Sequence, residues 1–167
     1  MVRSALKDVR QWKGGLTAKG CRFGIVVSRF NEYLTDQLLE SAVDTLRKQG
    51  ADPKKIHVAR VPGAFEVPLA AQKLIRKVKP DAVLTLSVVI RGKTKHFDQV
   101  VTQCAKGVRE LMMATDVPVL LGMVSAEDPA DAVERVGAGK MNKGREWALS
   151  AIEMANLSKK LGGRKRA

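Results

Sequence analysis

Residues 82–98 read AVLTLSVVIRGKTKHFD, and this stretch indicates the fold more clearly than any other part of the chain. Its first nine residues, Ala82–Ile90, are almost all apolar or β-branched, as is typical of a strand buried on both faces. From Phe97 onward, apolar side chains recur at helical spacing. The polar residues between them therefore form a short strand-to-helix connection. Because ligands of open α/β sheets bind at the carboxyl ends of the strands, we expect a ligand here.

The same alternation of apolar strands and amphipathic helices continues along the whole chain. Further strands are predicted at 23–28, 56–61 and 117–124, and helices at 35–50, 64–78, 97–114, 129–137 and 145–161. This order predicts an α/β fold: one three-layer sandwich with a four-stranded parallel sheet and helices on both faces. We expect an N-terminal arm at 1–20, the α/β domain at 21–158 and a basic C-terminal tail at 159–167.

Length and composition fit one cytoplasmic domain. The chain has 167 residues, 45% of them hydrophobic, which suffices for a substantial core. Cys21 and Cys104 lack metal-ligand spacing, so we interpret them as reduced thiols of a cytosolic protein. The first residues lack the apolar core of a signal peptide, and no apolar run is long enough to cross a membrane.

The net charge is +13, and basic residues crowd both ends of the chain. They are Arg3, Lys7, Arg10 and Lys13 at one end and Lys159, Lys160, Arg164, Lys165 and Arg166 at the other. They could be solvated ends, or they could bind nucleic acid without sequence specificity. We expect no base-stacking aromatic residue within either cluster.

A cluster of functional side chains follows each predicted strand. Because parallel strands end at one edge of a sheet, we expect the four clusters to converge there. They are Arg29-Phe30-Asn31, Gly63-Ala64-Phe65-Glu66, Gly92-Lys93-Thr94-Lys95-His96 and Ser125-Ala126-Glu127-Asp128.

Phe30 and Glu66 each allow two interpretations. The ring of Phe30 could stack on a flat heterocycle, or it could fold back as a hydrophobic plug. The carboxylate of Glu66 lies in the first turn of a helix, where the dipole favours it. Alternatively, it could accept hydrogen bonds from the hydroxyls of a polyol.

His96 lies at a predicted helix start, where free amides bind anions, and Lys93 and Lys95 add positive charge. An imidazole beside an anion site can take and give a proton, although a lone histidine can also be structural. We interpret His57, inside a strand, as structural. Arg135 and Lys143 could serve the site or form surface ion pairs. The sequence has no catalytic triad, metal cluster or dinucleotide-binding fingerprint.

Four segments in this order resemble the lumazine synthase (6,7-dimethyl-8-ribityllumazine synthase) family. They are FGIVVSRFN at 23–31, VPGAFEVP at 61–68, VIRGKTKHFD at 89–98 and NKGREWALSAIEMANL at 142–157. The resemblance implies a flavodoxin-like fold and a cytoplasmic transferase of riboflavin biosynthesis. This enzyme condenses 5-amino-6-(D-ribitylamino)uracil with 3,4-dihydroxy-2-butanone 4-phosphate, releases phosphate and water, and needs no metal or redox cofactor.

The resemblance also implies roles for individual residues. His96 would transfer protons, Phe30 would stack on the pyrimidine ring, and Glu66 would accept the ribityl hydroxyls. Arg135 would pair with the phosphate. Further substrate-binding positions implied by the family pattern are Asn31, Ala64, Phe65, Val89, Ile90, Lys93, Thr94, Leu121, Lys143 and Glu146.

The family places each site between neighbouring subunits of a homopentamer, and some members pack twelve pentamers into an icosahedral shell of 60 subunits. Riboflavin synthase is then a candidate partner. The chain departs from the family pattern at Ser87, Lys95, Gln99, Leu121 and residues 138–141, which bears on rate, affinity and assembly size. Two alternatives remain open. One is a basic nucleic-acid-binding or scaffold protein that kept the fold without the activity, and the other is an α/β protein that binds a phosphosugar or nucleotide.

Overall fold

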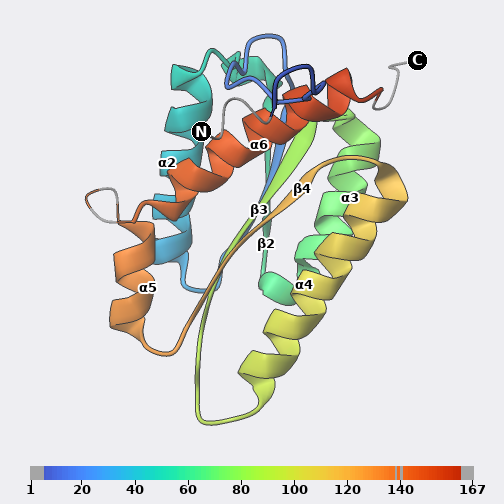
Figure 1. The fold of residues 1–167 in the computed structure, drawn as a ribbon. Helices are drawn as coiled ribbons and strands as arrows, with labels where there is room; N and C mark the ends of the chain where they lie inside the picture. Colours follow the sequence, from blue (N-terminus) through green and yellow to red (C-terminus); the bar gives the residue numbers. More distant parts are fainter. Residues whose placement is uncertain (1–5, 138, 140, 163–167) are drawn as a thin grey trace.

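The computed structural model describes residues 6–137, 139 and 141–162 and confirms the α/β fold (Figure 1). All four strands are parallel, in the order β2-β1-β3-β4. The strands are β1 (Phe23–Ser28), β2 (Ile56–Val61), β3 (Ala82–Ile90) and β4 (Val119–Ala126). The helices are α2 (Glu32–Lys48), α3 (Val67–Val78), α4 (His96–Thr115), α5 (Pro129–Val136) and α6 (Lys143–Lys160), with short 3₁₀ turns η1 (Pro53–Lys55) and η2 (Ala64–Glu66).

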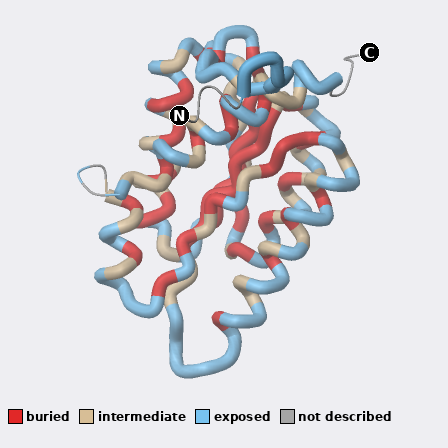
Figure 2. The backbone as a smooth tube through the Cα atoms, in the orientation of Figure 1, coloured by how far each residue is buried: buried red, intermediate tan, exposed pale blue. Residues whose placement is uncertain are grey.

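Helices cover both faces of the sheet, which gives the three expected layers. One apolar cluster joins the sheet to α2, α5 and α6, and a second joins it to α3 and α4. β1 and β3 are the two central strands: every residue of β1 is buried, and so are the residues of β3 from Ala82 to Val88. Figure 2 shows burial concentrated along the sheet and on the inner sides of the helices. The apolar run Ala82–Ile90 therefore lies at the centre of the core.

The first helix begins earlier than the predicted position 35. α2 starts at Glu32, and Asn31 before it adopts a left-handed conformation with φ 59°. Thr35 is buried inside the helix, where its hydroxyl donates to the carbonyl oxygen of Ser28 at 2.8 Å. The predicted start at Thr35 was wrong, because Thr35 lies one turn inside the helix and its hydroxyl ties the helix to β1.

Other boundaries differ by about two residues. β4 runs to Ala126 rather than 124, so Ser125 belongs to the strand and not to the exit loop. α6 begins at Lys143, inside the predicted polar turn, since Asn142 caps it by accepting the N–H of Arg145. In the described part of the chain, no helix has the length and apolar character needed to span a bilayer.

Candidate active site

Hydrogen bonds between loops join the exits of β1, β2 and β3. The N–H of Phe30 donates to the carbonyl oxygen of Pro62 at 3.0 Å, which ties the β1 exit to the β2 exit. The side-chain amide of Asn31 donates to the carbonyl oxygen of Val88 at 2.9 Å and reaches β3. The left-handed backbone of Asn31 gives its side chain this direction. The exits therefore converge at one edge of the sheet, as the sequence predicted.

Arg91, directly after β3, connects the remaining exit. Its Nε donates to Glu127 at 2.6 Å, and its two terminal nitrogens contact both oxygens of Asp98 at 3.0 and 3.1 Å. The guanidinium also lies 4.1 Å from the ring centroid of Phe97. The hydrogen bonds that Arg91 donates to these carboxylates, to Asp98 above all, raise the pKa of Arg91 and hold the pKa of Asp98 below its usual range. Both ends of the loop 91–98 are thus fixed together.

A cavity of about 600 Å³ lies at this edge, a size typical of small-molecule sites. Eight of the residues proposed from sequence line it: Phe30, Ala64, Phe65, Glu66, Val89, Ile90, Thr94 and His96. Six further residues line it: Gly63, Val88, Gly92, Phe97, Gln99 and Val100. Gly63 and Gly92 belong to the strand-exit clusters named from the sequence, but the sequence analysis gave them no binding role. Gln99 and Val100 follow His96 by three and four residues, and this helical spacing was the available signal for them.

The structure bears on both alternatives stated for the cavity side chains. The ring of Phe30 is 72% exposed, so it does not act as a hydrophobic plug. Glu66 does serve its own helix turn, because its Oε2 accepts the N–H of Gly63 at 2.9 Å. The same carboxylate nevertheless lines the cavity. An exposed aromatic face and a fixed carboxylate thus share one cavity with the apolar ends of Val89 and Ile90.

His96 is the first residue of α4, a helix of 20 residues, and lines the cavity. Its N–H points to the hydroxyl oxygen of Thr94 at 3.4 Å. The N-cap residue, Lys95, makes no side-chain capping bond, which leaves the helix start suited to an external anion. Lys93 is exposed in the same loop but does not line the cavity. An imidazole therefore lies at a helix start that has no side-chain cap.

The other proposed site residues do not line this cavity within the single chain. Leu121 lies on the edge strand β4 and is 39% exposed. Arg135, on α5, contacts Asp131 at 3.3 Å and also donates to its carbonyl oxygen. Lys143 forms an ion pair of 2.6 Å with Glu146 on α6. Both basic residues thus form surface ion pairs, and α5 and α6 lie on the other face of the sheet from α4 (Figure 1).

Among the described residues, no group of histidine, cysteine and carboxylate side chains has the geometry of a metal site. The cavity combines aromatic and aliphatic side chains with the carboxylate of Glu66 and the imidazole of His96 at a helix start. A comparison with protein-family models agrees with this chemistry. Residues 20–159 match the family model described as 6,7-dimethyl-8-ribityllumazine synthase.

Proposed function

The chain belongs to the 6,7-dimethyl-8-ribityllumazine synthase family, and we propose that it catalyses the reaction of that name. It condenses 5-amino-6-(D-ribitylamino)uracil with 3,4-dihydroxy-2-butanone 4-phosphate and releases phosphate and water. The observation that carries this proposal is the content of the cavity at the sheet edge. Phe30, Glu66 and His96 come from three strand exits, yet they line the same space of about 600 Å³.

Each feature of the cavity suits one part of the two substrates. The exposed ring of Phe30 stacks on the pyrimidine, and the backbone of Val89 and Ile90 offers polar contacts to the ring edge. Glu66 accepts hydrogen bonds from the ribityl hydroxyls. The start of α4, with Thr94, holds the phosphate through its amides. The two substrates then lie side by side between η2 and α4.

The reaction moves several protons, which gives His96 its role. The substrate amine attacks the ketone, water leaves as a Schiff base forms, and phosphate is eliminated. The second nitrogen then attacks the remaining carbonyl carbon, and a second water leaves as the ring closes. An imidazole can accept and return a proton near neutral pH. Such acid–base assistance contributes about 10²–10⁴-fold, and holding two substrates in orientation contributes about 7–11 kcal/mol. We therefore expect the loss of His96 to slow the reaction without abolishing it.

The proposed site is completed by a neighbouring subunit of a pentamer. In one chain, Arg135 and Lys143 lie on the face of the sheet opposite α4 and do not line the cavity. A ring of identical subunits brings one face of each chain against the other face of the next. Leu121, Arg135, Lys143 and Glu146 of one subunit then approach the His96 cavity of its neighbour. Arg135 exchanges its contact with Asp131 for the substrate phosphate.

The activity is tested by mixing both substrates with the purified protein and following the absorbance of the lumazine product. We expect product from the unaltered chain, a reduced rate with His96→Ala, and a raised KM for the phosphate substrate with Arg135→Ala. Absence of product from a correctly folded protein contradicts the proposed function. An unchanged KM with Arg135→Ala contradicts the role of that residue alone.

A mixed-subunit experiment tests the shared site. His96→Ala and Arg135→Ala chains are unfolded together and reassembled at equal amounts. If each site takes His96 from one subunit and Arg135 from the next, random mixing leaves about one quarter of the sites with both native residues. Activity then rises above that of either variant alone. If both residues serve a site within one chain, mixing the two variants restores no activity.

A further inference from the structure

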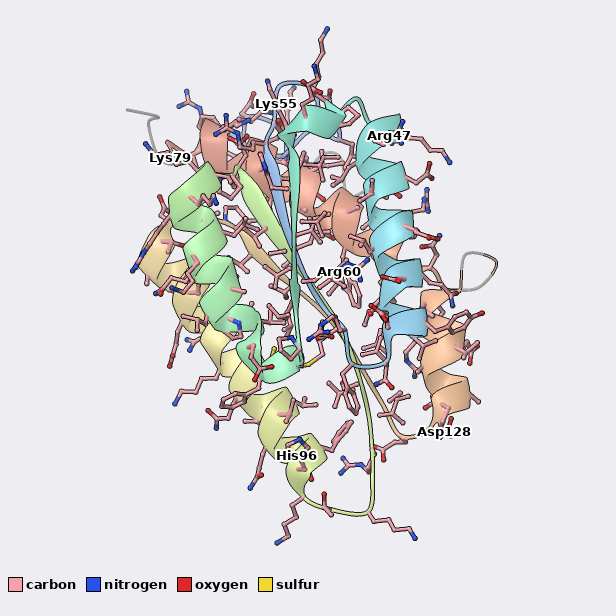
Figure 3. The ribbon with its side chains drawn as sticks, turned by 180° about the vertical axis from the view of Figure 1, so that it is seen from behind. Arg47, Lys55, Arg60, Lys79, His96 and Asp128 are labelled. Carbon is pink, nitrogen blue, oxygen red and sulfur yellow. The ribbon has the colours of Figure 1, made fainter. Side chains whose placement is uncertain are left out.

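The positive charge of the chain is concentrated at the end of the molecule opposite the candidate active site. α2, α3 and α6 all end where the strands begin. Each carries two basic residues in its last turn: Arg47 and Lys48, Arg76 and Lys77, and Lys159 and Lys160. The connections at the same end add Lys19, Arg22, Lys54, Lys55 and Lys79. We call these residues together the basic end. Figure 3 shows Arg47, Lys55 and Lys79 at one end of the molecule and His96 at the other.

Carboxylates offset little of this charge. Asp81 accepts the N–H of Arg22 at 2.6 Å and lies 3.3 Å from the Nζ of Lys159. Asp44 pairs with Lys48 at 2.7 Å. Asp52 caps η1 by accepting the N–H of Lys54, and Asp116 follows α4. The cations of the basic end therefore outnumber its acids.

At the opposite end of the molecule, carboxylates pair with the basic side chains. Arg60 lies 2.8 Å from Asp36 and 3.6 Å from Glu32, and Arg91 is held by Asp98 and Glu127. The excess of positive charge in the described residues is therefore a property of one end of the fold. Basic residues in the last turn of a helix also stabilise the helix dipole. That effect does not account for Lys19, Lys54, Lys55 and Lys79, which lie in connections or in η1.

An exposed tryptophan lies beside this charge. Trp12 is 52% exposed and lies between Arg10 and Lys13 in the N-terminal arm. The expectation that no aromatic residue lies within the basic clusters was wrong, and the sequence alone could have corrected it. The Nζ of Lys160 donates to the carbonyl oxygen of Lys13 at 2.7 Å, which anchors the arm at the end of α6.

A second contact fixes the direction of the arm. The side-chain amide of Asn156 donates to the carbonyl oxygens of Gly15 and Thr17 at 3.0 and 2.9 Å. The arm therefore lies along α6 close to its basic last turn (Figure 1). Trp12 directly precedes Lys13, the residue bonded to the end of α6, and is half exposed to solvent.

We propose that the basic end binds single-stranded nucleic acid through phosphate contacts and stacking of a base on Trp12. A positively charged surface that follows the backbone, together with an aromatic stacking residue, is the combination used by proteins that bind single strands without sequence preference. Anionic lipid would use the charge but would not need a stacking ring beside it. This property is independent of the proposed enzymatic function, since the basic end lies away from the cavity (Figure 3).

The first experiment measures the anisotropy of a fluorescein-labelled 20-nucleotide RNA between 50 and 200 mM KCl. We expect log K to fall linearly with log salt, by about 0.7 for each phosphate neutralised. The combined variant Lys54→Gln, Lys55→Gln, Lys79→Gln should make the slope about 2 units less negative. The matched control removes three cations from the middle of α3 and from α4: Lys73→Gln, Lys106→Gln, Arg109→Gln. It should bind RNA as the unaltered chain does.

The second experiment separates stacking from charge. Trp12→Ala should weaken RNA binding about tenfold with an unchanged salt slope. It should bind heparin, a polyanion without bases, as well as the unaltered chain does. Three results would overturn the proposal: no RNA binding by the unaltered chain at 100 mM KCl, equal loss in the control variant, or binding only to vesicles that contain phosphatidylserine. Lumazine formation should be unchanged in the Lys54, Lys55 and Lys79 variant.

Discussion

Glu66→Gln separates the two tasks assigned to one carboxylate. Its Oε2 accepts the N–H of Gly63 at 2.9 Å, and the side chain also lines the cavity. The amide oxygen of glutamine can keep the bond to Gly63 while the charge is lost. Because the cap uses Oε2, we expect Oε1 to receive the hydroxyls of the ribityl chain. The substitution should therefore affect substrate affinity much more than stability.

The expected rise in KM follows from hydrogen-bond energies. A hydrogen bond to a charged acceptor is worth about 1.5–3 kcal/mol, against about 1 kcal/mol for a neutral one. Replacing the carboxylate at one hydroxyl then costs about 1 kcal/mol, or roughly a 5-fold rise in KM for the ribitylaminouracil. If two hydroxyls bind, the cost is about 2 kcal/mol and the rise roughly 30-fold.

Steady-state kinetics and thermal unfolding of two variants test whether Glu66 binds the substrate in addition to capping its helix turn. Glu66→Ala removes the cap as well, which costs about 1 kcal/mol and lowers Tm by about 2–4 °C. Glu66→Gln should leave Tm close to that of the unaltered chain. Glu110→Gln, in a surface pair on α4 with Lys106, controls for the lost charge. An unchanged KM together with a lowered Tm in Glu66→Gln would show that Glu66 only caps its helix turn, and the reasoning would fail.

Three further predictions concern stability and reactivity. Gly144→Ala should destabilise the fold by about 1–3 kcal/mol, because the new Cβ would lie 2.5 Å from the carbonyl oxygen of Leu38. This clash should outweigh the better helix propensity of alanine. A raised urea midpoint would contradict the prediction. Arg91 lowers the pKa of Asp98 in the folded state, so their interaction stabilises the fold above the unfolded pKa of about 4 and is lost as pH falls through the lower folded value. Urea midpoints of the unaltered chain and Asp98→Asn should therefore differ at pH 7 and converge towards pH 2; a constant difference would exclude the ion pair as its cause. Burial raises the pKa of the Cys104 thiol to about 11, so iodoacetamide at pH 8 should modify it only after unfolding, as mass spectrometry of the peptide can show.

Local sequence patterns predicted the strands better than the helix starts. The structure has three strands at the predicted bounds: Phe23–Ser28, Ile56–Val61 and Ala82–Ile90. The first and third are apolar runs of the kind that marks strands buried on both faces. The second contains His57 and Arg60 and lies at the edge of the sheet, where it is only partly buried. The starts of α2 and α6 were placed late. Both follow asparagines in left-handed conformations, with φ 59° at Asn31 and 46° at Asn142, and periodicity does not report backbone conformation.

The candidate site was predictable only in part. The convergence of the strand exits followed from parallel topology, and it placed His96 and Glu66 around one cavity. The connection from Arg91 to Glu127 was not foreseen, since it joins residues far apart in sequence whose pairing depends on the register of β3 and β4. In the proposed pentamer, the positions of Arg135 and Lys143 relative to the cavity depend on contacts between chains, which local sequence patterns do not encode.

The strand order also determines how long β1 lacks its second partner strand while the chain is synthesised on the ribosome. β1 pairs with β2 on one side and β3 on the other, and Phe23 lies opposite Ala82. At about 5–20 residues per second, the first strand emerges several seconds before its second neighbour. During that interval its apolar edge has no permanent partner from β3 and is open to aggregation. Slower translation of the segment before β3 should therefore increase the demand for chaperones, whereas slowing after β4 should not.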